Sequence, residues 1–278
     1  SGGVSCDIYR VETASGTVCV KQALEKLRVA ADWRAPVERS HAEVEWLRLA
    51  ERLGRPLAPR VLAESPGDHL FVMSYLPPEA YPNWKAELMA GRIDPAFAAA
   101  VGRDLAFVHG KTAYAAAVAR DFGHGAMFKA LRIEPYLLHT ATRHTDLAER
   151  LTALAGETLE TAIALVHGDV SPKNILVGPE GPVFLDAECA WFGDPAFDLA
   201  FCLAHLVLKA VWRPELRAAY LAAFEALAET YLAAARWEPR AALDARAGAL
   251  LAALLLARID GKSPVEYLTD QRDRAFVR

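Results

Sequence analysis

A short segment in the middle of the chain holds side chains that could do chemistry. It reads His167-Gly168-Asp169-Val170-Ser171-Pro172-Lys173-Asn174, and Asp186 follows a little later. Transfer of a phosphoryl group to a hydroxyl needs a carboxylate that orients the attacking oxygen, oxygen ligands for Mg²⁺ and a cation on the phosphates. Asp169 could orient the hydroxyl, while Asn174 and Asp186 could hold a hard cation. The alternative interpretation is a surface turn in which Asp169 caps a helix.

Two short apolar stretches must position these side chains. Residues 175–177 and 183–185 flank the turn Gly178-Pro179-Glu180-Gly181, a pattern that predicts a small hairpin among helices. Asp186 then ends the second strand, next to the loop that precedes the first. We therefore expect the orienting carboxylate and the two cation ligands to converge at one point.

The first part of the chain is typical of a small sheet. Residues 7–13 and 17–21 alternate around a turn and predict a hairpin, and two further strands are expected at residues 60–65 and 69–75. A helix is expected between these two pairs of strands, at residues 40–53.

The sequence changes character after Leu76-Pro77-Pro78 and becomes rich in Ala and Leu. From there on it predicts mostly helices, the long ones at residues 94–109, 195–208, 214–235 and 239–260. Residues 261–268 are expected to form a helix cap and a short helix, to which we assign no chemical role. A sheet followed by a run of helices is an α+β arrangement. We expect two domains, residues 1–76 and residues 77–278.

Composition narrows the possible partners. The 278 residues are 53% hydrophobic and 24% charged with a net charge of -4, which is ordinary for a soluble globular enzyme. No dense block of Lys or Arg occurs, so nucleic acid is not expected as a partner. The longest apolar run, residues 247–257, is too short to cross a bilayer and predicts a buried helix, so no membrane is expected either.

The four cysteines indicate a reducing compartment. Cys6, Cys19, Cys189 and Cys202 form no CxxC pair, and all but Cys6 lie in apolar runs. This pattern predicts reduced, mostly buried thiols rather than disulfides or a zinc site. With no visible secretory leader, the expected location is the cytoplasm.

The segment around Asp169 resembles the catalytic loop of the aminoglycoside phosphotransferase and choline kinase superfamily, small-molecule kinases distantly related to protein kinases. The resemblance extends over nearly the whole chain. It implies a bilobal protein-kinase-like fold with a small antiparallel-sheet N-lobe and a larger, mostly helical C-lobe, and ATP and Mg²⁺ as cofactors. Asp169 is then the catalytic residue, Asn174 and Asp186 hold the metal, and His167 has a structural role.

The first part of the sequence also resembles the N-lobe of this family. Ser1-Gly2-Gly3-Val4-Ser5 resembles the loop that covers the phosphates, with Ser5 among its contacts, so the family's first strand is expected to precede Ser1. Val18-Cys19-Val20-Lys21 resembles the strand whose lysine holds the α- and β-phosphates. Residues 72–77 resemble the hinge between the lobes, where backbone groups of Ser74 and Leu76 would meet the adenine, with Met73 behind it.

Glu43 is implied as the ion-pair partner of Lys21, and helical spacing agrees. Glu43 falls inside the apolar sector of the expected helix, which consists of Ala42, Trp46, Leu47, Leu49, Ala50 and Leu53. The alternative is that Glu43 completes a capping box with Ser40. Because a carboxylate that faces a core needs a partner, we favour Lys21.

The sequence after the metal ligands departs from protein kinases. Asp186-Ala187-Glu188 resembles choline kinases and methylthioribose kinases, where the second carboxylate lies near the metals; the alternative for Glu188 is a solvent-facing position. Asp198 is expected to brace the catalytic loop through its backbone amides. Only eleven residues separate Asp186 from Asp198, which leaves no room for a peptide-binding activation segment, and Ser171 replaces the kinase lysine. A hydroxyl on a small molecule is therefore the expected acceptor.

The identity of the acceptor stays open. Basic residues in the segment before the catalytic loop and at the carboxyl end depart from aminoglycoside-modifying members, which bind polycations; they are Lys129, Arg132, Arg143, Arg150, Arg272, Arg274 and Arg278. A sugar, an amino alcohol such as choline, or a methylthioribose-like compound fits as well. The choice between ATP and GTP and the oligomeric state are also open, and a non-catalytic nucleotide-binding regulator is the alternative of another class.

Overall fold

The amino-terminal part of the chain forms one antiparallel sheet. A computed structural model describes residues 6–25 and 36–278, so the phosphate-covering loop expected at residues 1–5, including Ser5, lies outside the described residues. The sheet has the order β1-β2-β4-β3, formed by β1 (Cys6–Thr13), β2 (Gly16–Ala23), β3 (Val61–Ser65) and β4 (Leu70–Ser74). All four strands agree with the sequence-based prediction within two residues at each end.

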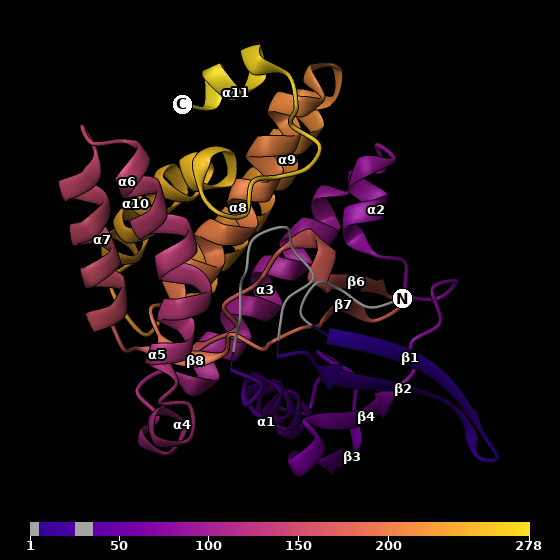
Figure 1. The fold of residues 1–278 in the computed structure, drawn as a ribbon. Helices are drawn as coiled ribbons and strands as arrows, with labels where there is room; N and C mark the ends of the chain where they lie inside the picture. Colours follow the sequence, from indigo (N-terminus) through magenta and orange to yellow (C-terminus); the bar gives the residue numbers. More distant parts are fainter. Residues whose placement is uncertain (1–5, 26–35) are drawn as a thin grey trace.

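Helix α1 (Arg39–Arg52) packs against this sheet (Figure 1). Its buried face contains Trp46, Leu47 and Glu43, whereas Arg52 is exposed. The helix begins at Arg39, and no side chain caps its first turn, so the capping-box alternative for Glu43 is wrong. The reason is that the Glu43 carboxylate points into the core instead of back toward the start of the helix.

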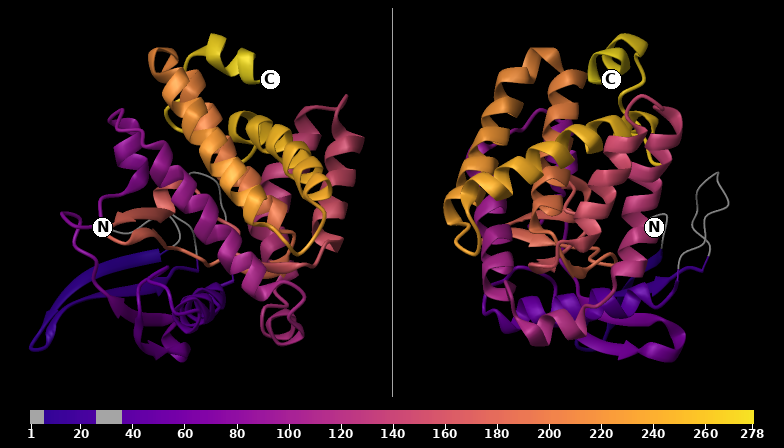
Figure 2. Two further views of the ribbon diagram at one scale, coloured as in Figure 1. Left: turned by 180° about the vertical axis from the view of Figure 1, so that it is seen from behind. Right: turned by 90° about the vertical axis from the view of Figure 1, so that its left-hand side faces the viewer.

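Helices make up the larger part of the molecule, which lies on one side of the sheet and α1 (Figures 1 and 2). Their bounds are α2 (Trp84–Met89), α3 (Pro95–Thr112), α4 (Ala116–Asp121), α5 (Gly125–Phe128), a π-helical segment (Lys129–Leu138), α6 (His139–Arg143), α7 (Ala148–Glu160), α8 (Pro195–Trp212), α9 (Arg217–Ala234), α10 (Arg240–Asp260) and α11 (Gln271–Val277). α3 packs along α9, and α8 packs on both α9 and α10. The contact of α3 with α9 requires Gly102, because a Cβ there would lie 2.4 Å from the carbonyl oxygen of Leu227.

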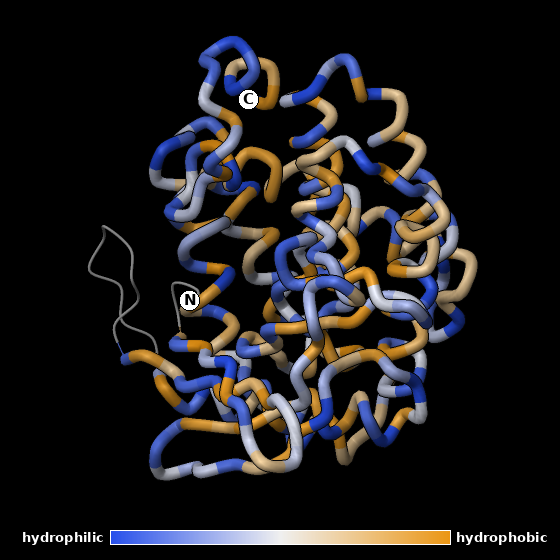
Figure 3. The backbone as a smooth tube through the Cα atoms, turned by 90° about the vertical axis from the view of Figure 1, so that its right-hand side faces the viewer, coloured by the Kyte–Doolittle hydropathy of each residue, from blue (hydrophilic) through white to orange (hydrophobic). Residues whose placement is uncertain are grey.

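Helix α8 is the centre of the helical part. Its N-cap is Asp194, whose side chain accepts a hydrogen bond from the amide of Ala196 at 3.0 Å. Among the described residues it is the one helix long and apolar enough to span a membrane, but 89% of it is buried inside the protein, as in the core helix of a globular fold. Other helices alternate hydrophobic and hydrophilic stretches along their length, as expected where one face is buried (Figure 3).

Two small strand pairs interrupt the helices. β5 (Ala164–Val166) pairs with β8 (Trp191–Gly193), and β6 (Ile175–Gly178) pairs with β7 (Gly181–Phe184). The second pair is the hairpin expected from the sequence. Together the two pairs hold the segment around Asp169 and the segment around Asp186 at fixed positions between the sheet and the helices.

One expected element is wrong. Residues 261–268 suggested a cap and a short helix, but they form bends, and the helix α11 follows only at Gln271. Tertiary contacts fix this segment instead, since Arg258 donates to the carbonyl oxygen of Ser263 and Lys85 pairs with Glu266. The fold as a whole is the expected bilobal, protein-kinase-like arrangement. No disulfide joins the cysteines of the described residues.

Candidate active site

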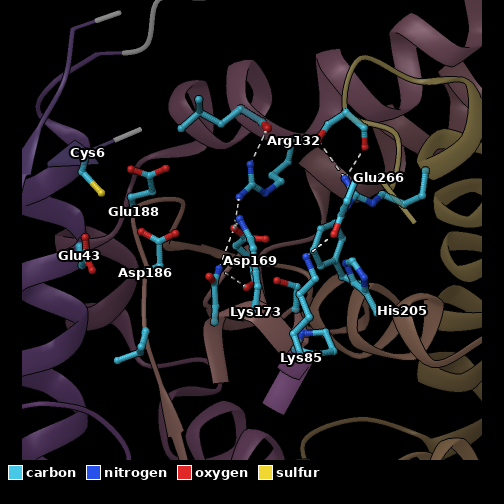
Figure 4. Close-up of a pocket in the computed structure, with 18 of the residues that line it drawn as sticks. Cys6, Glu43, Lys85, Arg132, Asp169, Lys173, Asp186, Glu188, His205 and Glu266 are labelled. Carbon is cyan, nitrogen blue, oxygen red and sulfur yellow. Dashed lines mark hydrogen bonds and ion pairs between the residues drawn. The ribbon is translucent and has the colours of Figure 1, made fainter. Parts of the chain in front are cut away.

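A cavity of about 510 Å³ lies between the sheet and the helical part. Six of the residues singled out in the sequence line it: Lys21, Glu43, Asp169, Asn174, Asp186 and Glu188. Figure 4 shows Glu43, Asp186 and Glu188 at one end, Asp169 and Lys173 in the middle, and Lys85, His205 and Glu266 at the other end. We call the first the sheet end and the last the α8 end.

Lys21 joins the two parts of the molecule. Its Nζ lies 2.8 and 2.7 Å from the two carboxylate oxygens of Glu43 and 2.5 Å from Oδ1 of Asp186. Burial disfavours the ammonium, but Asp186 and Glu43 outweigh it and raise the pKa of Lys21 well above its usual range. Burial likewise opposes ionisation of Asp186, yet Lys21 and Lys173 lower the pKa of that carboxyl. A charged lysine and a charged aspartate are therefore both present at the sheet end.

Asp169 is held by three donors that all reach one of its oxygens. Oδ2 lies 2.8 Å from Nδ2 of Asn174, 2.9 Å from Nη2 of Arg132 and 3.3 Å from Nζ of Lys173. In the part of the chain that the structure describes, no hydrogen bond is donated to Oδ1. The carboxylate is buried and fixed in orientation, with one oxygen left for another group.

Asn174 and Asp186 fit a hard cation. The Asn174 amide donates its NH₂ to the backbone oxygen and to Oδ2 of Asp169, which leaves its carbonyl oxygen unused. Asp186 has φ 65°, a left-handed conformation uncommon for residues other than glycine, and its carboxylate contacts Lys21. Within residues 6–25 and 36–278, no group of three or more His, Cys, Asp or Glu side chains is arranged to hold a metal ion. One carboxylate and one amide oxygen are nonetheless the kind of small ligand set that Mg²⁺ uses when phosphates supply further oxygens.

Glu188 is buried rather than solvent-facing, so that alternative is wrong. Its Oε2 accepts a hydrogen bond at 3.0 Å from Nε of Arg39, the first residue of α1. Burial, followed by the nearby charge of Asp186, raises the pKa of Glu188. A second carboxylate thus lies at the sheet end of the cavity, with an arginine as its partner.

The loop before Asp169 is braced from behind, as expected of Asp198. The two oxygens of Asp198 accept hydrogen bonds from the amides of His167 and Gly168 at 2.7 and 2.8 Å. His167 in turn accepts from the amide of Asp169 at 3.2 Å, and its ring packs on Trp46 of α1. Gly168 has φ 79°, and a Cβ there would lie 2.6 Å from the oxygen of Cys189, so this position requires glycine.

Two residues of the expected hinge, Ser74 and Leu76, lie outside the cavity wall. Met73 lines the cavity, but Ser74 and Leu76 do not. The amide of Ser74 donates to the oxygen of Arg60 at 2.9 Å, and its hydroxyl accepts from the amide of Arg60 at 3.0 Å. Ser74 thus holds β4 to the segment before β3.

Sequence reasoning missed most of the α8 end. The additional polar residues there are Lys85, Arg132, His205, Lys209, Arg258, Ser263, Glu266 and Tyr267. Arg132 stood out only as one of several basic residues, and the loop at residues 261–268 carried no assignment. A usable signal was present in α8, which is apolar apart from Asp198, His205 and Lys209. His205 and Lys209 follow Phe201 at intervals of four, which puts them on one face.

Comparisons with known proteins agree with this arrangement. The sequence profile described as "Phosphotransferase enzyme family" matches residues 1–243. A methylthioribose kinase of Escherichia coli O45:K1 is 27% identical, in a match that covers 74% of this chain and 56% of that protein. The chain thus spans little more than half the length of this curated relative.

Solved structures share the fold. A choline/ethanolamine kinase family protein from Mesorhizobium loti has a TM-score of 0.56 at 20% identity, covering 93% of this chain and 76% of that one. The streptomycin-ATP-APH(2")-IIa ternary complex has a TM-score of 0.50 at 15% identity, covering 100% of this chain and 87% of that one. Since the profile match covers most of the sequence, the chain belongs to the phosphotransferase enzyme family.

Proposed function

We propose that the protein is an ATP-dependent phosphotransferase that moves the γ-phosphate of ATP to a hydroxyl of a small molecule. The observation that carries this proposal is the contact of Lys21 in the sheet with Asp186 in the helical part, beside Asp169 and Asn174 in one cavity. These are the parts that phosphoryl transfer requires, a phosphate-binding cation, cation ligands and an orienting carboxylate.

Each residue has a task in this reaction. Oδ1 of Asp169 accepts the hydrogen bond of the substrate hydroxyl and takes its proton as the new bond forms. Arg132 and Lys173 keep the other oxygen fixed, so that the carboxylate is aimed before substrate arrives. Lys21 binds the α- and β-phosphates while Glu43 holds its ammonium in place. Mg²⁺, held by Asn174 and Asp186, would neutralise charge on the β- and γ-phosphates.

The same proposal includes roles for the residues around the adenine, the phosphates and the catalytic loop. The adenine would lie beside Met73, which lines the cavity, and backbone groups of Ser74 and Leu76 would contact it from just outside the cavity wall. Ser5 and its neighbours would cover the phosphates. Glu188 would lie near the metal while paired with Arg39. His167 and Asp198 hold the loop and do not touch the reacting groups.

The acceptor is proposed to be a metabolic hydroxyl compound rather than a polycationic aminoglycoside. Two observations support this choice. The curated relative is a methylthioribose kinase, and the α8 end of the cavity is lined by Lys85, Lys209 and Arg258, which would repel a polycation.

The test is ADP release from Mg-ATP, screened against a panel of sugars, amino alcohols and hydroxy acids. We expect one class of compound to stimulate ADP release, and Asp169→Asn to abolish the stimulation. Melting with and without Mg-ADP is measured alongside. Nucleotide binding without stimulation by any compound would favour a non-catalytic regulator, and no nucleotide binding would count against both functions.

A further inference from the structure

Lys209, at the α8 end of the cavity, is a buried cation without a carboxylate partner. The residue is 0% exposed. Its Nζ lies 3.4 Å from the hydroxyl of Tyr267 and 4.7 Å from the centre of that ring. No acidic side chain of the described residues forms an ion pair with it. A buried ammonium without a counter-charge is costly, so such a lysine loses its proton more easily unless a ligand supplies the negative charge.

Two further side-chain nitrogens at this end have no hydrogen-bond partner in the part of the chain that the structure describes. Nε2 of His205, one turn before Lys209 on α8, is buried and without a hydrogen-bond partner among the residues described here. Nε of Arg258 is likewise buried, and no described residue forms a hydrogen bond with it. The other end of the Arg258 guanidinium donates to the hydroxyl of Tyr136 at 3.2 Å and to Oγ of Ser263 at 3.0 Å, so it is oriented by neutral groups alone.

The charge balance of this part of the cavity is positive. Its cations are Lys85, Arg132, Lys173, Lys209 and Arg258, and its carboxylates are Asp169 and Glu266. Arg132 and Lys173 share Asp169, and Lys85 pairs with Glu266. Among the described residues, Lys209 and Arg258 form no ion pair with a carboxylate. Burial, reinforced by the charge of Lys85, lowers the pKa of Lys209 to about 7, which is the response of a lysine that lacks an anion.

The nucleotide does not account for these cations. Its phosphates are assigned to Lys21 at the sheet end, and Figure 4 shows Asp169 between that end and His205. A group bound between Asp169 and the α8 end lies on the side from which the hydroxyl of the acceptor must approach. The missing anion therefore belongs to the acceptor.

We propose that the acceptor substrate carries an oxyanion, a carboxylate or a phosphate ester, which binds between Lys209, Arg258 and His205 while its hydroxyl meets Asp169. This inference rests on the proposed phosphotransferase function and narrows its substrate class. Lys209 and Arg258 supply charge, and neutral His205 donates from Nε2. Tyr267 forms the wall that holds the ammonium in place.

The experiment uses four compounds that share one carbon skeleton, namely glucose, glucosamine, gluconate and glucose 6-phosphate. Each is titrated calorimetrically into the full chain saturated with Mg-ADP at constant ionic strength. We expect gluconate or glucose 6-phosphate to bind at least about tenfold more tightly than glucose, and glucosamine to bind least. Comparison of gluconate with glucose 6-phosphate separates a carboxylate site from a phosphate site.

Two variants locate the effect. Lys209→Met should remove the preference for the anion, whereas Lys111→Met, which removes an exposed lysine of α3, should retain it. Equal binding of the four compounds, including no binding of any, would overturn the anion site. Binding of Mg-ADP is measured first, so failure of the nucleotide to bind counts against the phosphotransferase function, and equal binding in its presence counts only against the anion site.

Discussion

The two ends of the cavity use a buried lysine in opposite ways. Lys21, 5% exposed, has two carboxylates around its ammonium, and its pKa is raised. Lys209, 0% exposed, has no carboxylate partner among residues 6–25 and 36–278, and its pKa falls to about 7. At the sheet end the ammonium is paired within the chain, so that geometry exists before any ligand binds. At the α8 end the balance is incomplete, and a ligand must complete it.

The largest expected effect lies between the two ends. Asp169→Asn keeps the shape of the side chain but removes the proton acceptor, so turnover should fall by roughly 10²–10⁴-fold while Mg-ADP affinity changes little. Steady-state kinetics and calorimetry measure the two quantities. A variant that keeps most of its turnover would remove Asp169 from the proposed role.

The same substitution at each end should have opposite effects on stability. Lys21→Met leaves the Glu43 and Asp186 carboxylates buried without their cation, so the free energy of unfolding should fall by about 3–5 kcal/mol. Urea denaturation monitored by circular dichroism measures this change. An unfolding midpoint equal to that of the unmodified protein would show that Lys21 does not hold the two parts together.

Nucleotide binding tests whether the sheet end is ready for its ligand. At a concentration 100 times its Kd, Mg-ADP should add about 2.7 kcal/mol to the free energy of unfolding, which raises Tm by several degrees. The shift should be much smaller with ADP and a chelator, because Asn174 and Asp186 then have no cation to hold. Equal shifts with and without Mg²⁺ would contradict the assignment of these two residues.

The smallest expected effect is a gain in stability at the α8 end. Lys209→Met replaces an unpaired buried cation with an apolar side chain of similar length, and should add about 1–2 kcal/mol to the free energy of unfolding at pH 6. The groups around Lys209 are Lys85, Glu266, Arg258 and Tyr267.

The pH dependence of this gain follows from the lowered pKa. Between about pH 7 and the ordinary lysine pKa of 10.5, the unfolded chain binds a proton that the folded chain does not, so the stability of the unmodified protein rises with pH in this window. The advantage of Lys209→Met should therefore be greatest below pH 7 and decline as pH rises. Thermal melts at pH 6 and pH 9 measure it, and a loss of stability at pH 6 would show that the ammonium has a partner.

Sequence reasoning succeeded where a function depends on local order and spacing. The strands around Lys21, the hairpin between Asn174 and Asp186, and the buried face that includes Glu43 all follow from residue periodicity. These features are close in sequence or lie on one element. They were therefore visible before any tertiary contact was known.

The α8 end could not be predicted in the same way. Its residues come from α2, the π-helical segment, α8, α10 and the bends that follow, and only tertiary packing brings these together. A lone lysine or histidine within an apolar helix does not reveal whether a carboxylate lies opposite it. The failed expectation of a helix at residues 261–268 had the same origin, since contacts from Arg258 and Lys85 fix that segment.

The bends after α10 have a consequence for how such an enzyme can change. They are fixed to the rest of the molecule by Arg258 on Ser263, Lys85 on Glu266 and the amide of Lys262 on the oxygen of Pro135. None of these attachments involves Asp169, Asn174 or Asp186. A short peptide near the end of the chain can thus be exchanged without disturbing the phosphate chemistry, and selection for a new acceptor could proceed through that peptide while the catalytic loop stays as it is.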